Sequence, residues 1–233
     1  MGGPDSPDPE PDFIYFSKDF GVTWSQSNSL QQNWNFVSLS ASGQYQTAVA
    51  HTYPGDYIYV STDFGNTWTK SQNSPQKKWR SVSLSASGQY QTAVVQNDFI
   101  YVSNDFGNTW IPKLEVDRDW MYISLSASGQ YQTAVANDDF IYISNDFGNT
   151  WTQNTNSHQK IWMSVSLSAS GQYQMALAYT DYIYVSTDFG NKWTAISFPQ
   201  TTFNAVSMSG SGQYSTIVLL SSTSIYTSKS STP

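Results

Sequence analysis

The sequence contains no cysteine, which excludes disulfide frameworks, thiolate nucleophiles and cysteine metal clusters. Charge is also scarce, because Asp, Glu, Lys and Arg make up 12% of the 233 residues, against about 25% in an average soluble protein. The formal net charge is −7, and no basic run is longer than Lys77-Lys78. Binding to phosphate backbones needs clustered cations, so we do not expect a nucleic-acid partner.

Long apolar runs are missing as well, and no segment approaches the roughly 18 apolar residues of a membrane span. The sequence therefore predicts no membrane partner. The N-terminus, MGGPDSPDPEPDF, has neither the basic nor the apolar region of a secretory signal, and nothing else indicates a compartment. Residues 1–11 are predicted to be an acidic, proline-rich arm. A convincing helical period is also absent, so the expected fold is all-β.

An internal repeat organises the rest of the chain. The motif SASGQY begins at residues 40, 85, 126 and 168, and SGSGQY begins at residue 209. A second motif, S-x-D-F-G-x-x-W, keeps the same spacing, and its aspartates lie 41 to 44 residues apart. A period of about 42 residues is typical of one four-stranded blade of a β-propeller.

One repeat can be divided into four strands, A to D, over residues 79–110. Apolar residues alternate with serine over 79–85, which predicts strand A, and residues 89–95 alternate as strand B. The segment FIYVS at 99–103 has the β-branched and aromatic residues of strand C, and strand D begins at Thr109-Trp110.

The repeats predict one five-bladed β-propeller over residues 12–228, built from four-stranded blades. A composite last blade would close the ring by combining strands from both chain ends. Residues 13–16 and 224–228 both fit its third strand, which also makes self-association by strand exchange a possibility. The predicted units are the complete repeats 34–68, 79–110, 120–151 and 162–193, the composite blade 13–24 with 203–228, and a tail at 229–233.

The repeated box is expected to be a structural turn. Its aspartate can accept backbone N–H bonds two residues onward, its glycine permits positive φ, Asn66 tolerates a left-handed conformation, and its tryptophan can be buried between blades. The predicted structural residues are Asp19, Asp63, Asp105, Asp146 and Asp188 with Trp24, Trp68, Trp110, Trp151 and Trp193.

In this motif the chain resembles the Asp-box, or bacterial neuraminidase repeat, β-propellers. That group includes sialidases, sortilin-type receptors and photosystem II assembly factors, and the resemblance implies that the box lies away from the active face. Sialidases hold their substrate with three arginines, whereas this chain has only Arg80 and Arg118. A sialidase-like hydrolase is therefore the third-ranked reading, because a shared fold does not transfer function.

The connections opposite the boxes differ between repeats, and a ligand rim is predicted there. Each connection from strand D to strand A leads into an aromatic residue, and the turns from B to C end in aspartate. These side chains can form repeated pockets, or the aromatic rings can wedge between blades while the aspartates cap turns. The candidate residues are Trp34, Trp79, Trp120, Trp162, Phe203, Asp56, Asp98, Asp139 and Asp181.

The resulting functional prediction is a non-catalytic scaffold that binds a protein or glycan partner through the D–A and B–C loops, without metal or cofactor. A multivalent lectin is the alternative, because stacked aromatic rings and carboxylates suit sugars. An amplified or engineered repeat protein with no selected ligand is a further reading. No residue is predicted to be catalytic, since a nucleophilic serine needs a base within hydrogen-bond reach, and the only histidines, His51 and His158, do not recur with the repeated serines.

Overall fold

The computed structural model describes residues 11–198, 202–220 and 225–229. Within these ranges the chain is built from β-strands and one short 3-10 helix, η1 (Thr155–Ser157). No helix among the described residues is long and apolar enough to span a bilayer. The predicted arm at residues 1–11 and tail at 229–233 lie outside the described residues, apart from Pro11 and Lys229.

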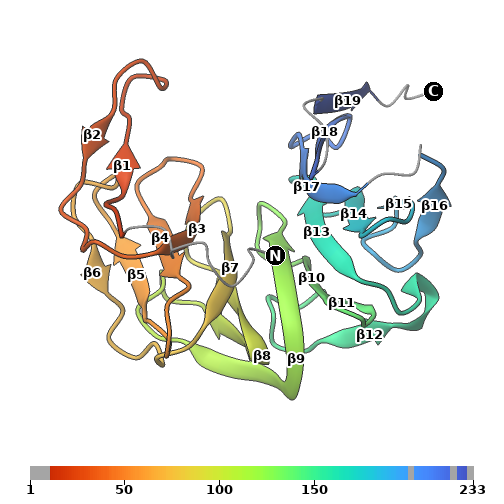
Figure 1. Ribbon diagram of the computed structural model, residues 1–233, viewed down its shortest axis with the longest axis horizontal. Helices are drawn as coiled ribbons and strands as arrows, with labels where there is room; N and C mark the ends of the chain where they lie inside the picture. The colour runs from red at the N-terminus through yellow and green to blue at the C-terminus, as the bar shows by residue number, and fades with distance from the viewer. Residues whose placement is uncertain (1–10, 199–201, 221–224, 230–233) are drawn as a thin grey trace, which may run out of the picture.

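Four blades stand around a common centre, each with its strands in the order A to D from the inside outward (Figure 1). The innermost strands β3, β7, β9, β13 and β17 contact one another in this order. Blade 1 consists of β3 (Trp34–Leu39), β4 (Gln46–Ala50), β5 (Ile58–Ser61) and β6 (Thr69–Lys70). Blade 4 consists of β13 (Trp162–Leu167), β14 (Gln174–Ala178), β15 (Ile183–Ser186) and β16 (Thr194–Ile196).

Blades 2 and 3 are joined in one six-stranded sheet. β8 runs through the predicted B–C turn and β9 through the predicted D–A loop, because Gln96 and Asp98 pair with Asp119 and Arg118. The pairing thus continues across the junction between the two blades. The sheet contains β7 (Trp79–Leu84), β8 (Gln91–Ser103), β9 (Ile111–Leu125), β10 (Gln132–Ala136), β11 (Ile141–Ser144) and β12 (Thr152–Asn154).

The hydrophobic core lies between blades rather than at one centre. Between blades 1 and 2, for example, Val49 and Ile58 of the first blade pack against Trp79 and Val82 of the second. Equivalent clusters separate blades 2 and 3, blades 3 and 4, and blade 4 from the last sheet. Each blade therefore depends on its neighbours for the burial of its apolar faces.

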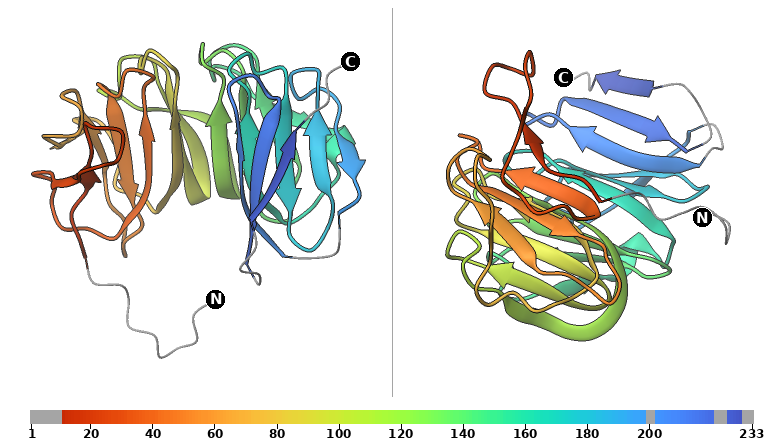
Figure 2. Two further views of the ribbon diagram at one scale, coloured as in Figure 1. Left: turned by 90° about the horizontal axis from the view of Figure 1, so that it is seen from above. Right: turned by 60° about the vertical axis from the view of Figure 1, so that its left-hand side comes forward.

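The prediction of five blades is wrong, because the described residues form four. The two chain ends do not combine: β1 (Tyr15–Phe16) pairs with β2 (Ser25–Gln26), while β17 (Phe203–Met208), β18 (Tyr214–Leu219) and β19 (Ile225–Lys229) form a separate sheet. The place beside β18 is taken by β19, whose connection is far shorter than one from the N-terminus and costs less loop entropy. The ring is open between the N-terminal hairpin and the last sheet (Figures 1 and 2).

Backbone hydrogen bonds link the A–B turns of successive units near the centre. Ala41 donates to the carbonyl of Ala86, which donates to Ala127, which donates to Ala169, and Ala169 donates to Gly210. The donor always belongs to the earlier unit. These bonds run in one direction from blade 1 to the last sheet.

Candidate functional site

The Asp boxes form closed hydrogen-bonded turns. In blade 1, Asp63 accepts bonds from the Thr67 backbone N–H at 2.9 Å and the Thr67 hydroxyl at 2.7 Å, while Ser61 Oγ accepts from Gly65 N–H at 3.0 Å. The aspartate thus reaches four residues onward rather than the predicted two. The same bonds to the residue four positions on recur at Asp19, Asp105 and Asp146, and Asp188 accepts the backbone bond from Lys192.

The left-handed residues of the box are Phe64 and Gly65, with φ of 63° and 83°, and Asn66 is not among them. The phenylalanine has a packing role in later blades. Phe106 lies against Tyr45 of the preceding unit with ring centroids 4.6 Å apart, and Phe147 and Phe189 repeat this contact with Tyr90 and Tyr131. Aromatic contact with a neighbour helps to offset the strain of positive φ at a bulky residue.

Four of the box tryptophans, Trp24, Trp68, Trp110 and Trp151, pack under their own turns, where the indole N–H donates to the carbonyl of the box glycine at 3.1 Å. The indole N–H of Trp193 has no hydrogen-bond partner among the described residues. Trp68, Trp110 and Trp193 are buried and Trp151 is half-buried. Trp24, in the N-terminal hairpin, remains 64% exposed. The same motif therefore has different surroundings at the chain's beginning and in its complete blades.

Hydrogen bonding lowers the pKa of box aspartates. Burial raises the pKa of Asp63, Asp105 and Asp146, but bonds from the threonine four residues on outweigh it, so all three pKa values lie below the ordinary 3.8. Asp19 in the N-terminal hairpin has a pKa of about 2, lowered first by the Thr23 hydroxyl. These carboxylates are held in their ionised form.

The predicted rim aromatics are packed inside the protein. Trp79, Trp120, Trp162 and Phe203 are 0% exposed, and only Trp34 is half-buried. Each buried indole donates to the backbone carbonyl of a rim aspartate in the preceding unit, as Trp79 does to Asp56 at 2.8 Å. With both ring faces covered, the geometry supports the role of blade wedge. Ligand binding by these residues stays a prediction.

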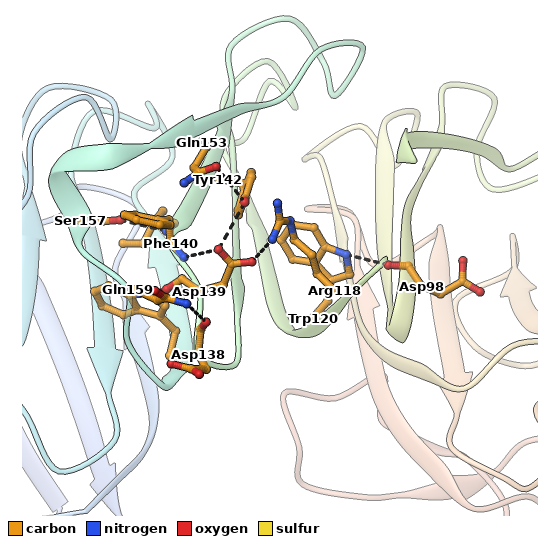
Figure 3. Close-up of polar contacts among 12 residues, drawn as sticks. Asp98, Arg118, Trp120, Asp138, Asp139, Phe140, Tyr142, Gln153, Ser157 and Gln159 are labelled. Carbon is orange, nitrogen blue, oxygen red and sulfur yellow. Dashed lines mark hydrogen bonds and ion pairs between the residues drawn. The ribbon is translucent and has the colours of Figure 1, made fainter. Parts of the chain in front are cut away.

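Three of the predicted rim aspartates are paired with cations that the sequence reading missed. Lys77 pairs with Asp98, Arg118 with Asp139, and Lys160 with Asp181. Figure 3 shows Asp139 between Arg118 and two further donors, the Phe140 backbone N–H at 2.8 Å and the Tyr142 hydroxyl at 3.4 Å. The available signal was a Lys or Arg two residues before Trp79, Trp120 and Trp162.

These pairs perturb the pKa values of their members. The bond to Asp98 raises the pKa of Lys77, and the bond to Asp181 raises that of Lys160. Burial and the Asp139 charge together raise the pKa of Tyr142 to about 12, because both disfavour the phenolate. Each of the three sites is therefore an ion pair beside a protonated tyrosine, and its geometry supports a structural role.

Blade 1 differs from this pattern in two ways. At Asp56 the cation position is occupied by Gln32, which donates to the Tyr59 hydroxyl at 3.4 Å. Its inner strand is also uncovered: Val37 and Leu39 are 45% and 49% exposed, whereas Val82 and Leu84 at the equivalent positions are 0% and 8% exposed. A cavity of about 270 Å³ lies at this face, bounded by Phe13, Trp34 and Val37.

Comparison with known proteins agrees with the fold. The BNR-Asp box repeat model matches residues 58–72 and 183–196, which include two of the boxes. The structure is similar to a GH74 enzyme of Niastella koreensis, with a TM-score of 0.69, 16% identity and coverage of 88% of this chain and 31% of that one. No curated protein has a significantly similar sequence.

Two further GH74 structures resemble this one. The GH74 xyloglucanase of Xanthomonas campestris gives a TM-score of 0.70 at 13% identity, covering 90% of this chain and 39% of that one. An ancestral GH74 enzyme gives 0.65 at 13% identity, covering 95% and 32%. This chain thus spans about a third of the length of those enzymes, and the likeness shows the fold alone.

Proposed function

Taking this chain as a member of the Asp-box β-propeller family, we propose that it is a non-catalytic scaffold that binds a protein partner on the open inner face of blade 1. The observation that carries the proposal is the exposure of Val37 and Leu39, whose equivalents are buried in the later blades. Paired exposed apolar residues beside a cavity are typical of an interaction surface.

The other junctions indicate what kind of partner fits. At each of them the preceding unit places its own strands A and B over this face, and a serine hydroxyl accepts a backbone N–H from the covered strand. Ser38 Oγ accepts from Leu84 N–H at 3.1 Å, and Ser83 and Ser124 repeat this bond to Leu125 and Leu167. At blade 1 the hairpin covers only the outer part of the face, through Ile14. The partner is therefore expected to present β-strands with small hydroxyl side chains.

The engagement of the carboxylates supports a non-catalytic role. Glycoside hydrolysis requires two carboxyl groups that face the same bond, one of them able to donate a proton. Here the box aspartates accept hydrogen bonds from their own turns, and Asp98, Asp139 and Asp181 are held by cations. Carbohydrate binding remains the second candidate because similar folds occur in GH74 enzymes, one of them a xyloglucanase.

Two variants with the same added charge test this function. Leu39→Asp places a carboxylate on the proposed surface, and Ile196→Asp does so at an exposed site on β16, in the outer strand of blade 4. A partner recovered with the wild-type chain is purified and its affinity measured directly. We expect Leu39→Asp to weaken binding at least tenfold and Ile196→Asp to leave it unchanged.

The same samples distinguish the alternatives. Equal binding by both variants would move the interaction away from blade 1. Binding on a glycan array without a protein partner would favour the lectin. Self-association by strand exchange would appear in sedimentation as a dimer that forms with rising concentration, and sensitivity of that dimer to Leu39→Asp would identify a second copy as the partner.

A further inference from the structure

A buried carboxylate in blade 1 lacks the cation that its counterparts have. In blades 2, 3 and 4, a Lys or Arg at the start of strand A pairs with the aspartate at the start of strand C. In blade 1 these two positions hold Gln32 and Asp56. The three aspartate–cation pairs of blades 2, 3 and 4 therefore indicate that a cationic group would fit beside Asp56 in blade 1.

The surroundings of Asp56 are otherwise preserved. Its Oδ1 accepts from the Tyr57 backbone N–H at 2.7 Å and from the Tyr59 hydroxyl at 3.3 Å, as Asp98 and Asp139 do from their own neighbours. Asp56 is only 6% exposed, and its Oδ2 is buried without a hydrogen-bond partner among the described residues. An ionised oxygen in this position is costly unless a donor of opposite charge reaches it.

The cations near Asp56 are engaged elsewhere. Lys77 exchanges two backbone bonds with Asp56, but its ammonium group pairs with Asp98. The ammonium group of Lys70 lies 3.1 Å from the centre of the Tyr57 ring. Gln32 carries no charge, and its amide donates to Tyr59 rather than to Asp56.

An entry route is indicated by the filled copies. The side chains of Lys77 and Lys160 are 33% and 24% exposed, so their stems run from the surface to the buried carboxylate. Gln32 is half-buried and has a shorter stem than lysine or arginine. A ligand that enters along the path taken by the lysine side chains would displace only the side-chain amide of Gln32.

We propose that Asp56, with Tyr59, is a binding site for an alkylammonium or guanidinium group, which takes the place that Lys77, Arg118 and Lys160 occupy in the other blades. A charge-assisted bond to Oδ2 stabilises the bound group. The site is independent of the proposed docking face, because it requires neither Val37 nor Leu39. Free amines and basic side chains of a protein share this chemistry.

The test uses the full chain with n-butylammonium and methylguanidinium as probes, and tetramethylammonium, which has no N–H donor, as the control at equal ionic strength. The readouts are the Tm and the NMR shift of the Tyr57 amide, which bonds to Asp56. At tenfold excess over its Kd, either probe should raise the Tm by a few degrees. Tetramethylammonium should not do so.

Substitutions locate the effect. Both readouts should be lost in Asp56→Asn and in Gln32→Lys, and retained in Gln31→Lys, which adds the same charge at an exposed neighbour. A response of Asp56→Asn equal to that of wild type, or an equal response to tetramethylammonium, would overturn the proposal. A lysine-containing peptide that binds tenfold more tightly than n-butylammonium would indicate a protein source, and equal affinity a free amine.

A second measurement holds even if Asp56→Asn fails to fold. If Gln32→Lys completes the fourth ion pair, its Tm should exceed that of Gln31→Lys by a few degrees without any ligand. The two variants have the same net charge, so a general electrostatic effect cancels. Equal Tm values would mean that the glutamine amide already satisfies Asp56, and the proposal would fail.

Discussion

Blade 1 and blade 3 have nearly the same sequence, yet they differ in how they are covered. Both faces of blade 3 are packed against neighbouring blades, whereas the face of blade 1 that precedes it in the array is only partly covered. Trp120 of blade 3 is fully buried, whereas Trp34 of blade 1 is half-buried and its indole N–H is unpaired among the described residues. The difference lies in the neighbour, since among the described residues only a hairpin precedes blade 1. A repeated motif therefore acquires its stability, and its availability for binding, from its position in the array.

The largest expected effect comes from the buried wedge. Trp120→Ala should destabilise the protein by about 3–5 kcal/mol, because it removes a fully buried indole and its bond to the Asp98 carbonyl. Trp24→Ala, in the exposed hairpin, should cost less than about 1 kcal/mol. Urea denaturation measures both, and similar losses would contradict the contrast between the chain's beginning and its interior.

The inner strands give the next contrast. Leu125→Ala should cost about 2–5 kcal/mol, because Leu125 is packed between blades 2 and 3. Leu39→Ala should cost less than about 1 kcal/mol in the isolated chain, since half of that side chain is already in water. If Leu39→Ala proves as costly as Leu125→Ala, the face of blade 1 is covered in solution.

A smaller effect is expected at the boxes. Asp105→Ala should lower stability by about 1–2 kcal/mol, because Thr109 loses the acceptor for its N–H and hydroxyl. Its effect on ligand affinity should be nil once folding is accounted for. Asp19→Ala should change global stability less, because the hairpin covers only the outer part of one blade's face. Loss of binding in folded Asp105→Ala would give the box a functional role.

Acid should reveal the smallest effect of a single group. The folded pKa values of Asp19, Asp63, Asp105 and Asp146 lie below the ordinary 3.8, so their contribution to stability is present above about pH 4. It should be lost as the pH falls through the folded values, which for Asp19 is about 2. Denaturation between pH 5 and 2, with carboxyl NMR titration, measures this loss. A titration of Asp105 at its ordinary pKa would contradict it.

The sequence predicted the strands and turns within each blade, because these depend on short-range patterns of residues. The alternation at residues 79–85, the turn at Gly88 and the spacing of the boxes each reflect a contact that recurs in every unit. Closure of the ring was predicted wrongly because residues 13–16 and 224–228 carry the same strand pattern. The pattern alone does not decide which of the two segments pairs with β18. β19 pairs with β18 through the shorter connection.

The candidate site was harder to predict for a different reason. The local sequence around an aromatic residue at the end of a polar loop is the same whether the side chain faces solvent or a neighbouring blade. Trp79, Trp120 and Trp162 are buried, and Lys77, Arg118 and Lys160 were not identified from the sequence as partners of the rim aspartates. The exception at Gln32 becomes visible only when the three filled sites are superposed on the fourth.

The directional bonds between the A–B turns have a consequence for how such a chain can change. Each unit donates one backbone bond to the next and accepts one from the unit before, as Ala86 does from Ala41 and toward Ala127. Duplication or loss of a whole 42-residue unit within the array leaves every remaining junction chemically the same. Repeat number is therefore free to vary in steps of one unit, while a partial insertion would break the succession of donors and acceptors.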